Sequence, residues 1–388
     1  NYRSIVWLSV SALKNKQNRM TIPPQYKILH VCKVYFPVMG GVQKVVSLVT
    51  SLLPQFSHHV LTTGEDGAIL EQEIDGVAIS RCRSYGQIAS MPIAPSLVFR
   101  MVRLFKRQDL IAIHYPFPLA EIALVFCFKS VPVVVHWHSN IVAQRKLRWI
   151  VAPFTLLMLL RAKSVVVSST AMIDNSTMLK AFRKKTQIIP YGIAEAKASM
   201  QSSDACDAYF VLIGRHVSYK GIDVAIRSIR NTAHKLVLVG DGPLLERHKQ
   251  LAIDMGLANS VRFVCDASDQ DVVDLLQYSI ALVSASNANN EAFALVQLEA
   301  MRLGKPIINT QLKSSAPWVA RHNKEAITVI PNDTMSLLNA MDLLSKDSEI
   351  ARRLGEGGLR RYYDLFSVEK FAQKSHDLYR SIIEQASR

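Results

Sequence analysis

Residues 284–305 read SASNANNEAFALVQLEAMRLGK, and the rest of the chain is best understood around this stretch. An Asn-rich loop leads to Glu291 and into a predicted helix that contains Glu299, and Gly304 marks the position where such a helix stops. If the whole segment were helical, the two carboxylates would lie roughly 12 Å apart along the axis. The free N–H groups of the helix start would lie between them, ready to receive phosphate. On its own, this spacing is more typical of an ordinary surface helix with solvated acids.

The length and composition of the chain indicate two globular domains, each with its own core. The chain has 388 residues, of which 49% are apolar. Its five cysteines form no C-x-x-C pair and are odd in number, which argues against both a disulfide frame and a zinc knuckle. A reducing cytosol is therefore the expected setting.

The excess positive charge is confined to the first half of the chain. Residues 1–192 hold 23 Lys and Arg against 8 Asp and Glu, whereas residues 193–388 hold 23 of each kind. A basic face can bind nucleic acid or an anionic membrane, and charge alone does not choose between them. The apolar content favours a membrane, and no RNP-like strand motif or zinc finger accompanies the charge.

One segment of the first half is suited to a membrane surface. Basic residues at 145, 146 and 148 lead directly into the apolar run of residues 149–160. This run is too short to span a bilayer, and Pro153 interrupts it. A helix lying at the membrane interface and a buried core helix explain the run equally well.

The first half also shows the alternation of strands and helices that builds a parallel sheet. A buried strand is predicted at residues 27–32, followed by a loop with Gly40 and Gly41 and a helix over residues 42–53. Further apolar strands are predicted at residues 58–62, 110–114, 131–135, 165–168 and 186–189. The paired glycines would let the backbone approach a ligand closely at a helix start, and a plain turn explains them equally well.

Two histidines follow the strand at residues 131–135. His136 and His138 come just beyond its carboxyl end, where α/β folds place ligand-binding side chains. A hydrogen bond from one of them to a ligand hydroxyl is one prediction. The His-x-His pattern also suits a metal, but no third ligand of suitable spacing accompanies it. For His136, a structural role is as good an explanation as a functional one.

The second half repeats the alternation after a linker. Residues 194–207 are small and polar without periodicity, and new strands are predicted at residues 208–214, 235–239, 261–264, 280–284 and 306–309. Two such runs predict an α/β protein with two Rossmann-like domains facing one another across a cleft. The tail, residues 360–383, is predicted to be helical.

Two cations follow the first strand of the second half. Arg215 and Lys220 lie between that strand and the next helix, where fixed positive charge can neutralise a diphosphate. Each residue alone is ordinary in a wet loop. Their combination with Glu291 and Glu299 is less ordinary, because it supplies cations and carboxylates suited to opposite ends of one nucleotide sugar.

At this point the chain resembles the retaining GT-B glycosyltransferases of family four, from residue 27 to the end. The matching segments are Gly40-Gly41, His138-Ser139, Ile189-Pro190-Tyr191-Gly192-Ile193, Gly214-Arg215, Lys220-Gly221, Val239-Gly240-Asp241-Gly242-Pro243, Glu291-Ala292-Phe293-Ala294-Leu295 and Glu299-Ala300. Together these motifs are specific for the fold and the reaction class. They imply catalysis without a cofactor or a metal.

The resemblance also implies roles for particular residues. Catalytic roles fall on His138, Arg215, Lys220 and Glu291. Donor contacts fall on Gly40, Gly41, Arg215, Lys220, Gly240, Phe293, Ala294, Leu295 and Glu299. Acceptor contacts fall on His114 and Asn140. No residue is expected to hold a metal.

The residue pattern, together with this resemblance, gives the domain boundaries. Residues 1–25 form an extension whose apolar patch is too short for a signal peptide. The acceptor- and membrane-facing domain covers residues 26–192, a linker covers 193–207, and the nucleotide-sugar domain covers 208–365. A C-terminal helix covers 366–388, and the fold leaves room for it to return to the first domain.

The pattern Asp269-Gln270-Asp271 is similar to the Asp-x-Asp metal motif of another glycosyltransferase fold. It precedes an apolar helical run, so helix capping explains it better. The chain departs from the family at Ala294, where Gly is common, and at Asn140, where Asp is common. The first departure predicts an altered fit to the donor, and the second a weaker positioning of the acceptor.

The segments Tyr35-Phe36-Pro37, His114-Tyr115-Pro116 and His138-Ser139 are similar to those of bacterial mannosyltransferases that build O-antigen or related lipid-linked polysaccharides. GDP-mannose is therefore the favoured donor, and UDP-hexoses and deoxysugar nucleotides remain alternatives. The expected acceptor is a polyprenyl-diphosphate-linked glycan. The expected location is peripheral, on an anionic membrane surface at the cytoplasmic side.

Two other function classes compete with the enzyme. A non-catalytic nucleotide or glycan binder of the same fold would lack at least one of Arg215, Lys220, Glu291 and Glu299, and all are present. A nucleic-acid-binding protein would use the basic face, and no nucleic acid is expected as a partner.

Overall fold

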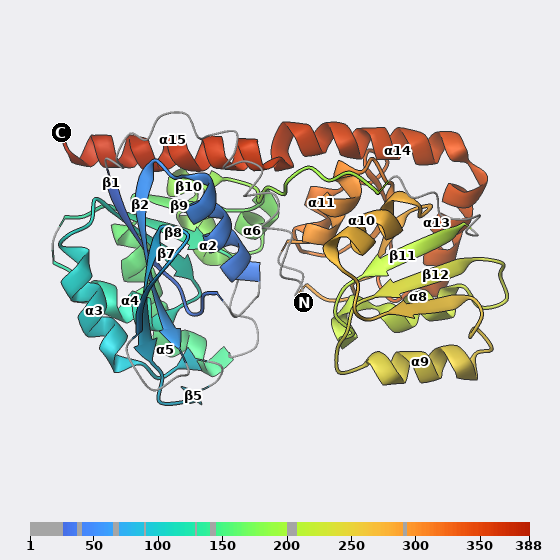
Figure 1. Cartoon of the computed structure of the whole chain (residues 1–388), viewed down its shortest axis with the longest axis horizontal. Coiled ribbons are helices and arrows are strands. Elements are labelled where there is room, and N and C mark those ends of the chain that lie inside the picture. Colours follow the sequence, from blue (N-terminus) through green and yellow to red (C-terminus); the bar gives the residue numbers. More distant parts are fainter. Residues whose placement is uncertain are drawn as a thin grey trace. The chain divides into compact units, whose positions relative to one another are not determined.

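The structure is a computed structural model that describes residues 26–36, 41–64, 70–88, 91–128, 130–139, 145–199, 208–289 and 293–388, with only the backbone at 41 and 145–148. The N-terminal extension, the end of the linker, Gly40, Asn140 and Glu291 lie outside the described residues. The chain divides into two compact units (Figure 1). Residues 26–191 together with Phe371–Arg388 belong to the N-terminal unit, and Gly192–Lys370 form the second unit.

The N-terminal unit is built on an eight-stranded sheet of order β10-β9-β8-β7-β1-β2-β4-β3. All neighbours are parallel except the antiparallel pair β3 and β4. The strands are β1 (Tyr26–Val31), β2 (Phe56–Gly64), β3 (Leu70–Ile74), β4 (Val77–Arg83), β7 (Leu110–Tyr115), β8 (Val133–Trp137), β9 (Ser164–Val167) and β10 (Thr186–Ile188), and a small hairpin pairs β5 (Gln87–Ile88) with β6 (Met91–Pro92).

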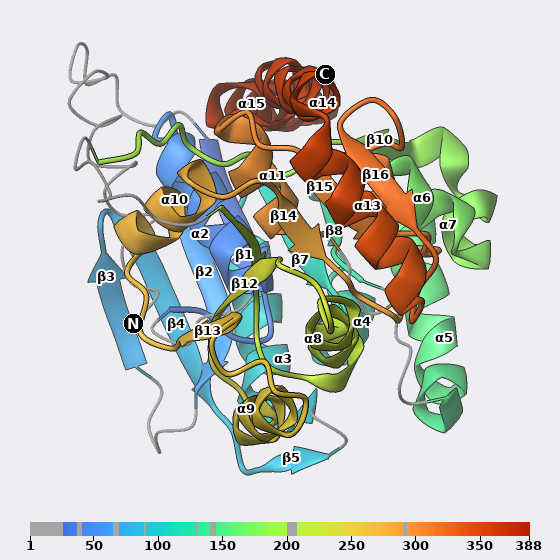
Figure 2. The ribbon, with the colours of Figure 1, turned by 90° about the vertical axis from the view of Figure 1, so that its right-hand side faces the viewer.

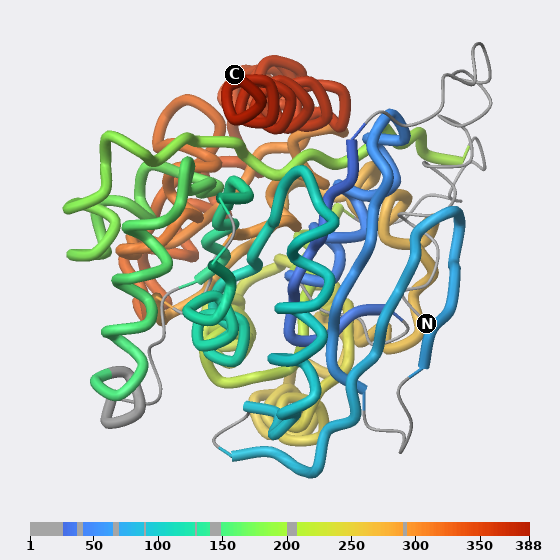
Figure 3. Tube along the Cα trace, turned by 90° about the vertical axis from the view of Figure 1, so that its left-hand side faces the viewer, coloured from blue at the N-terminus to red at the C-terminus, as the bar shows by residue number. Residues whose placement is uncertain are grey.

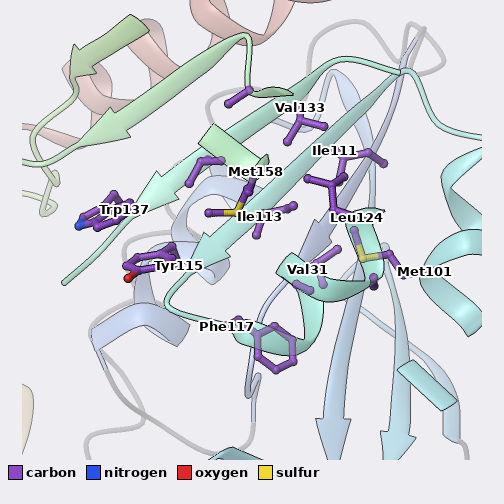
Figure 4. Close-up of a cluster of buried hydrophobic side chains, with 14 of the residues drawn as sticks. Val31, Met101, Ile111, Ile113, Tyr115, Phe117, Leu124, Val133, Trp137 and Met158 are labelled. Atoms are coloured by element: carbon purple, nitrogen blue, oxygen red, sulfur yellow. The ribbon is translucent and has the colours of Figure 1, made fainter. Parts of the chain in front are cut away.

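Helices cover both faces of this sheet because its central strands are apolar on both sides. One face packs against α3 (Pro95–Phe105), α4 (Pro118–Val125) and α5 (Arg145–Arg161), which Figure 3 shows in front of the sheet. Figure 4 shows the core beneath them, where Ile113 and Val133 meet Leu124 and Met158. The short helices α6 (Thr170–Asp174) and α7 (Thr177–Ala181) complete this side. Helix α5 runs unbroken through Pro153.

The opposite face packs against α2 (Gly41–Leu52) and α15 (Val368–Ala386). Phe371, Leu378 and Tyr379 of α15 are buried there against Ile28 and Val134. The return of the C-terminal helix to the N-terminal unit is therefore confirmed.

The sequence predicted a helical tail over residues 360–383, but in the structure this helix is interrupted. Helix α14 (Ser348–Arg361) passes into a π-helical turn, Tyr362–Phe366, and α15 begins only at Val368. The break arises because Ser367 is extended and bridges to Ile193, whose N–H donates to the carbonyl oxygen of Phe366 at 2.9 Å.

The second unit carries a six-stranded, wholly parallel sheet of order β13-β12-β11-β14-β15-β16. Its strands are β11 (Tyr209–Ile213), β12 (Lys235–Val239), β13 (Val261–Val264), β14 (Leu282–Ser284), β15 (Ile307–Thr310) and β16 (Ala326–Val329). Its helices are α8 (Ile222–Ser228), α9 (Leu245–Asp254), α10 (Asp269–Gln277), α11 (Leu295–Arg302), α12 (Ala316–Val319), α13 (Thr334–Lys346) and α14. Figure 2 shows α8 and α13 on one side of this sheet and α10 and α11 on the other.

The start of the predicted linker is hydrogen-bonded to α10 and to Tyr278, the residue that follows it. The backbone N–H and the hydroxyl of Ser199 donate to the Asp274 carboxylate at 2.7 and 2.6 Å, and the Tyr278 hydroxyl donates to the Ser199 carbonyl at 3.2 Å. Residues 193–199 therefore belong structurally to the second unit.

Candidate functional site

The candidate site lies at the carboxyl ends of β11 and β14. Within the second unit the strands follow the order 3-2-1-4-5-6, so the chain turns to opposite sides after β11 and after β14. Open α/β sheets bind ligands outside the strand ends at this switch point. The loop after β11 carries Arg215 and Lys220, and the loop after β14 is the Asn-rich stretch that leads to α11.

Lys220 is folded back over the end of β11. A Cβ atom added to Gly214 would lie 3.3 Å from Lys220 Cε and 3.7 Å from its Nζ, so the side chain crosses directly above this glycine. Arg215, the next residue after Gly214, is exposed, and within the described part of the chain its guanidinium makes no ion pair. The structure thus brings both predicted cations to one strand end.

Gly221 packs the loop after β11 closely against the end of β14. It has a left-handed backbone, with φ of 63°, and an added Cβ would lie only 2.1 Å from the carbonyl oxygen of Ala285. The Asn287 N–H donates to the Tyr219 carbonyl oxygen at 2.9 Å. These two contacts hold Lys220 beside the Asn-rich loop.

The loop after β12 approaches the same strand end. Gly240 has φ of 131°, and a Cβ there would lie 2.3 Å from the carbonyl oxygen of Gly214. The His216 N–H donates to the Asp241 carbonyl oxygen at 2.9 Å. Gly240, expected to contact the donor, therefore lies against the Gly214-Arg215 corner.

Helix α11 begins at Leu295, later than a wholly helical Glu-x7-Glu segment would require. The separation of roughly 12 Å, which assumes a wholly helical segment, therefore does not apply. Ala294 occupies the N-cap position without a side-chain cap. In the first turn, the N–H groups of Leu295 and Gln297 donate to the carbonyl oxygens of Phe293 and Ala294 at 2.8 and 2.9 Å. Phe293 and Ala294 are themselves buried.

Glu299 lies in the second turn of α11 and is half-buried. Its charge acts on the buried Arg302, whose pKa is lowered mainly by burial and raised in part by this carboxylate. The predicted helix stop is confirmed at Gly304, with φ of 64°. The N–H groups of Gly304 and Lys305 donate to the carbonyl oxygens of Met301 and Ala300, both at 3.0 Å, which is a Schellman ending.

In the N-terminal unit, the predicted site histidines are buried. His138 uses both ring nitrogens: Nε2 lies 2.9 Å from His114 Nδ1, and Nδ1 lies 2.7 Å from the Tyr191 hydroxyl. His136 Nε2 lies 2.6 Å from the hydroxyl of Tyr379 on α15, a structural contact. Burial lowers the pKa of His138 to about 3, so its imidazole is neutral at physiological pH and is a weak base.

His114, expected at the acceptor, lies beneath His138. Only 1% of its surface is exposed, and its Nε2 lies 3.2 Å from His30 Nδ1. In this conformation it has no free nitrogen for an acceptor. The sequence reading missed His30, His58 and Tyr191 as members of this group, although His30 and His58 stand in two of the predicted strands.

The Asp269-Gln270-Asp271 pattern caps α10, as predicted. The N-cap residue is Ser268: its hydroxyl accepts from the Asp271 N–H at 3.2 Å, and its own N–H donates to the Asp271 carboxylate at 2.8 Å. Among the described residues, no group of three or more His, Cys, Asp or Glu is arranged to hold a metal.

The chain is similar to known glycosyltransferases. The family description "Glycosyltransferase Family 4" matches residues 39–197, and "Glycosyl transferases group 1" matches residues 197–361. O-antigen chain mannosyltransferase C of Escherichia coli is 26% identical over 93% of this chain and 100% of its own length. D-rhamnosyltransferase WbpZ of Pseudomonas aeruginosa is 27% identical over 88% of this chain and 92% of its own.

A solved structure shares the fold. HepE of Anabaena, crystallised with UDP, superposes with a TM-score of 0.73 at 18% identity and covers 92% of this chain and 100% of its own. The two family matches meet at residue 197 and together span most of the chain. The chain therefore belongs to the family-four (group 1) glycosyltransferases of the GT-B fold, which are retaining hexosyltransferases that work without a metal.

Proposed function

We propose that this enzyme transfers mannose from GDP-mannose to a polyprenyl-diphosphate-linked glycan during the synthesis of a bacterial surface polysaccharide. The names of the two relatives support the sugar, because D-rhamnose is the 6-deoxy form of D-mannose. The runner-up is transfer from a UDP-sugar or a deoxysugar nucleotide on the same fold.

The proposal rests on one observation. Arg215 and Lys220 follow β11, and the loop that leads to α11 follows β14, so both loops lie at the switch point of the second sheet. Two cations neutralise a diphosphate, and the backbone around Phe293–Leu295 is suited to donate N–H hydrogen bonds to its oxygens. Glu299, one turn further along α11, is suited to the ribose hydroxyls. Gly40, Gly41 and Glu291 complete the donor site in this proposal, with Glu291 at the transferred sugar.

The proposed reaction proceeds on one face of the sugar. The bond between the anomeric carbon and the diphosphate breaks, and a bond to the acceptor oxygen forms on the same side. The acceptor proton passes to the departing phosphate oxygen. Arg215 and Lys220 stabilise the negative charge that grows on this leaving group.

The test is a panel of nucleotide sugars assayed with a polyprenyl-diphosphate glycan acceptor. GDP-mannose should give the highest kcat/KM, measured as nucleoside diphosphate released only when acceptor is present. A preference for a UDP-hexose would replace the donor and leave the reaction class intact. A lack of turnover with every donor would contradict the proposed transfer.

We also propose that the N-terminal unit docks on an anionic membrane through α5. One face of α5 is core, with Val151, Met158 and Leu159 buried. The other face exposes an apolar stripe that consists of Trp149, Ile150, Pro153, Leu156, Leu157 and Leu160. The two interpretations of this segment, core helix and interface helix, thus apply to opposite faces.

Apolar side chains are also exposed just after α4, whose end contacts the end of α5. Arg161 Nη1 donates to the carbonyl oxygen of Leu124 at 2.8 Å, which joins the ends of α5 and α4. Directly after Leu124, Phe126 is exposed and Phe128 is 90% exposed. Exposed Lys163 and the basic sequence at 145–148 flank this surface, and this charge complements anionic lipid. No described helix is both long enough and apolar enough to cross a bilayer.

The double variant Leu157→Glu/Leu160→Glu should weaken binding to phosphatidylglycerol vesicles by about a hundredfold, because apolar contact is lost and negative charge is added. Sedimentation with these vesicles, and with neutral vesicles for comparison, measures the effect. The matched control is Ile253→Glu on α9, at a residue that is 60% exposed. Unchanged vesicle binding, or tight binding to random duplex DNA in place of vesicles, would contradict the docking surface.

A further inference from the structure

A continuous row of hydrogen bonds crosses the interior of the N-terminal unit. It begins at the carbonyl oxygen of Leu53, which lies 2.9 Å from His58 Nε2. His58 Nδ1 lies 3.0 Å from His30 Nε2, and His30 Nδ1 lies 3.2 Å from His114 Nε2. His114 Nδ1 then meets His138 Nε2 at 2.9 Å, and His138 Nδ1 meets the Tyr191 hydroxyl at 2.7 Å. We call this the histidine row.

The sheet register produces the row. His58 on β2 pairs with Ile28 on β1, and His30 stands two residues further along β1. His30 pairs with Ala112 on β7, and His114 stands two residues further. His114 pairs with His136 on β8, and His138 follows two residues later. Because a shift of two residues keeps a side chain on the same face, all four imidazoles lie on one face in a diagonal.

The Leu53 carbonyl determines which nitrogen of each imidazole in the row donates a hydrogen bond and which accepts one. A carbonyl oxygen only accepts, so His58 Nε2 must carry a proton. A neutral imidazole has one N–H, so His58 Nδ1 accepts from His30 Nε2–H, and the same logic passes through His114 to His138. Burial lowers the pKa of His58 to about 4 and those of His30 and His114 well below the ordinary value, which keeps the rings neutral.

The reversed row is unfavourable. If His138 carried its proton on Nδ1, every ring would reverse, and the lone pair of His58 Nε2 would face the Leu53 oxygen at 2.9 Å. Two buried acceptors would then meet without a proton between them. Leaving two such buried groups unsatisfied disfavours the reversed row.

We propose that the Leu53 carbonyl, acting through His58, His30 and His114, fixes His138 as the Nε2–H tautomer, so that His138 Nδ1 serves only as a hydrogen-bond acceptor. His58, His30 and His114 are then positioning residues. Their functional importance rests on the proposed function, in which His138 lies beside the transferred sugar and accepts a hydrogen bond from one of its hydroxyls.

This arrangement limits what His138 can bind. In this tautomer the Tyr191 hydroxyl, 2.7 Å from Nδ1, donates to it, and a sugar hydroxyl can replace it because a hydroxyl also brings a proton. An unprotonated phosphate oxygen cannot replace it, because two acceptors would meet. The histidine row therefore selects a hydroxyl over the diphosphate at this position.

The test is ¹⁵N NMR of the whole chain labelled at histidine, in which two-bond ring couplings report the protonated nitrogen. In the wild type, the rings of His58, His30, His114 and His138 should all carry the proton on Nε2. In His58→Phe the anchor is lost, and the His138 signals should shift toward a mixture of tautomers. The matched control is His59→Phe, on the same strand, which removes a ring bonded to the Ser80 hydroxyl at 2.7 Å and outside the row.

Two results would overturn the proposal. One is a wild-type His138 protonated on Nδ1, and the other is a folded His58→Phe variant in which His138 keeps the wild-type tautomer. If His58→Phe does not fold, Tyr191→Phe gives a second test: His138 should stay protonated on Nε2, and a change to Nδ1 would refute the row. These readouts need no glycosyl transfer, so they are independent of the proposed donor and acceptor.

Discussion

Lys220→Ala is expected to lower kcat/KM for the nucleotide-sugar donor by about 100- to 1000-fold. The ammonium group is held above Gly214 at the end of β11, and Gly221 and Tyr219 fix the loop that carries it. In the proposed reaction, its loss would leave Arg215 alone to neutralise the charge that grows on the departing diphosphate. The measurement is the initial rate of nucleoside diphosphate release over a range of donor concentrations.

The matched control is Lys249→Ala. Lys249 is a cation of the same unit, and its ammonium pairs with Glu246 on α9 at 2.8 Å. It should leave the rate unchanged. If Lys220→Ala and Lys249→Ala had equal rates, the diphosphate would not lie at this strand end. Asp269→Ala should also retain activity, because the acids there serve the start of α10.

The sequence predicted most of the sheets because parallel strands are buried on both faces and appear as apolar runs. It missed β3, whose sequence LEQEI is polar and whose position is an exposed sheet edge. It also missed β4, the edge strand β16 of the second sheet, and the short hairpin of β5 and β6. It also missed the interruption at Ser367. The helical pattern continues through that point, and only the pairing with Ile193, distant in sequence, draws the backbone out of the helix.

The candidate site likewise has a part that the sequence predicts and a part that it does not. Arg215 and Lys220 were predictable, because residues after a first strand reach the switch point whatever the details of packing. The bonds that occupy His138 were not. They depend on the pairing of the strands. Each histidine of the row stands two residues beyond the residue that pairs with the preceding histidine. A register shift of one residue would place an imidazole on the other face of the sheet.

Gly221→Ala is expected to reduce the free energy of unfolding of the second unit by about 3 kcal/mol. The new Cβ would lie 2.1 Å from the Ala285 carbonyl oxygen, so the loop after β11 and the end of β14 must separate. Lys220, the preceding residue, would move with the loop. The KM for the donor should therefore rise by about tenfold as well. Urea unfolding and donor titration measure the two effects.

Gly256→Ala separates backbone strain from the clash. Gly256 has nearly the same φ, 69° against 63° for Gly221, but a Cβ there meets nothing within 4 Å. Its substitution should cost about 1 kcal/mol and leave the donor KM unchanged. If both variants lost the same stability and bound donor equally well, the left-handed backbone alone would explain the glycine. A larger loss confined to Gly221→Ala, with weaker donor binding, would mean that the close approach to Ala285 holds Lys220 in place.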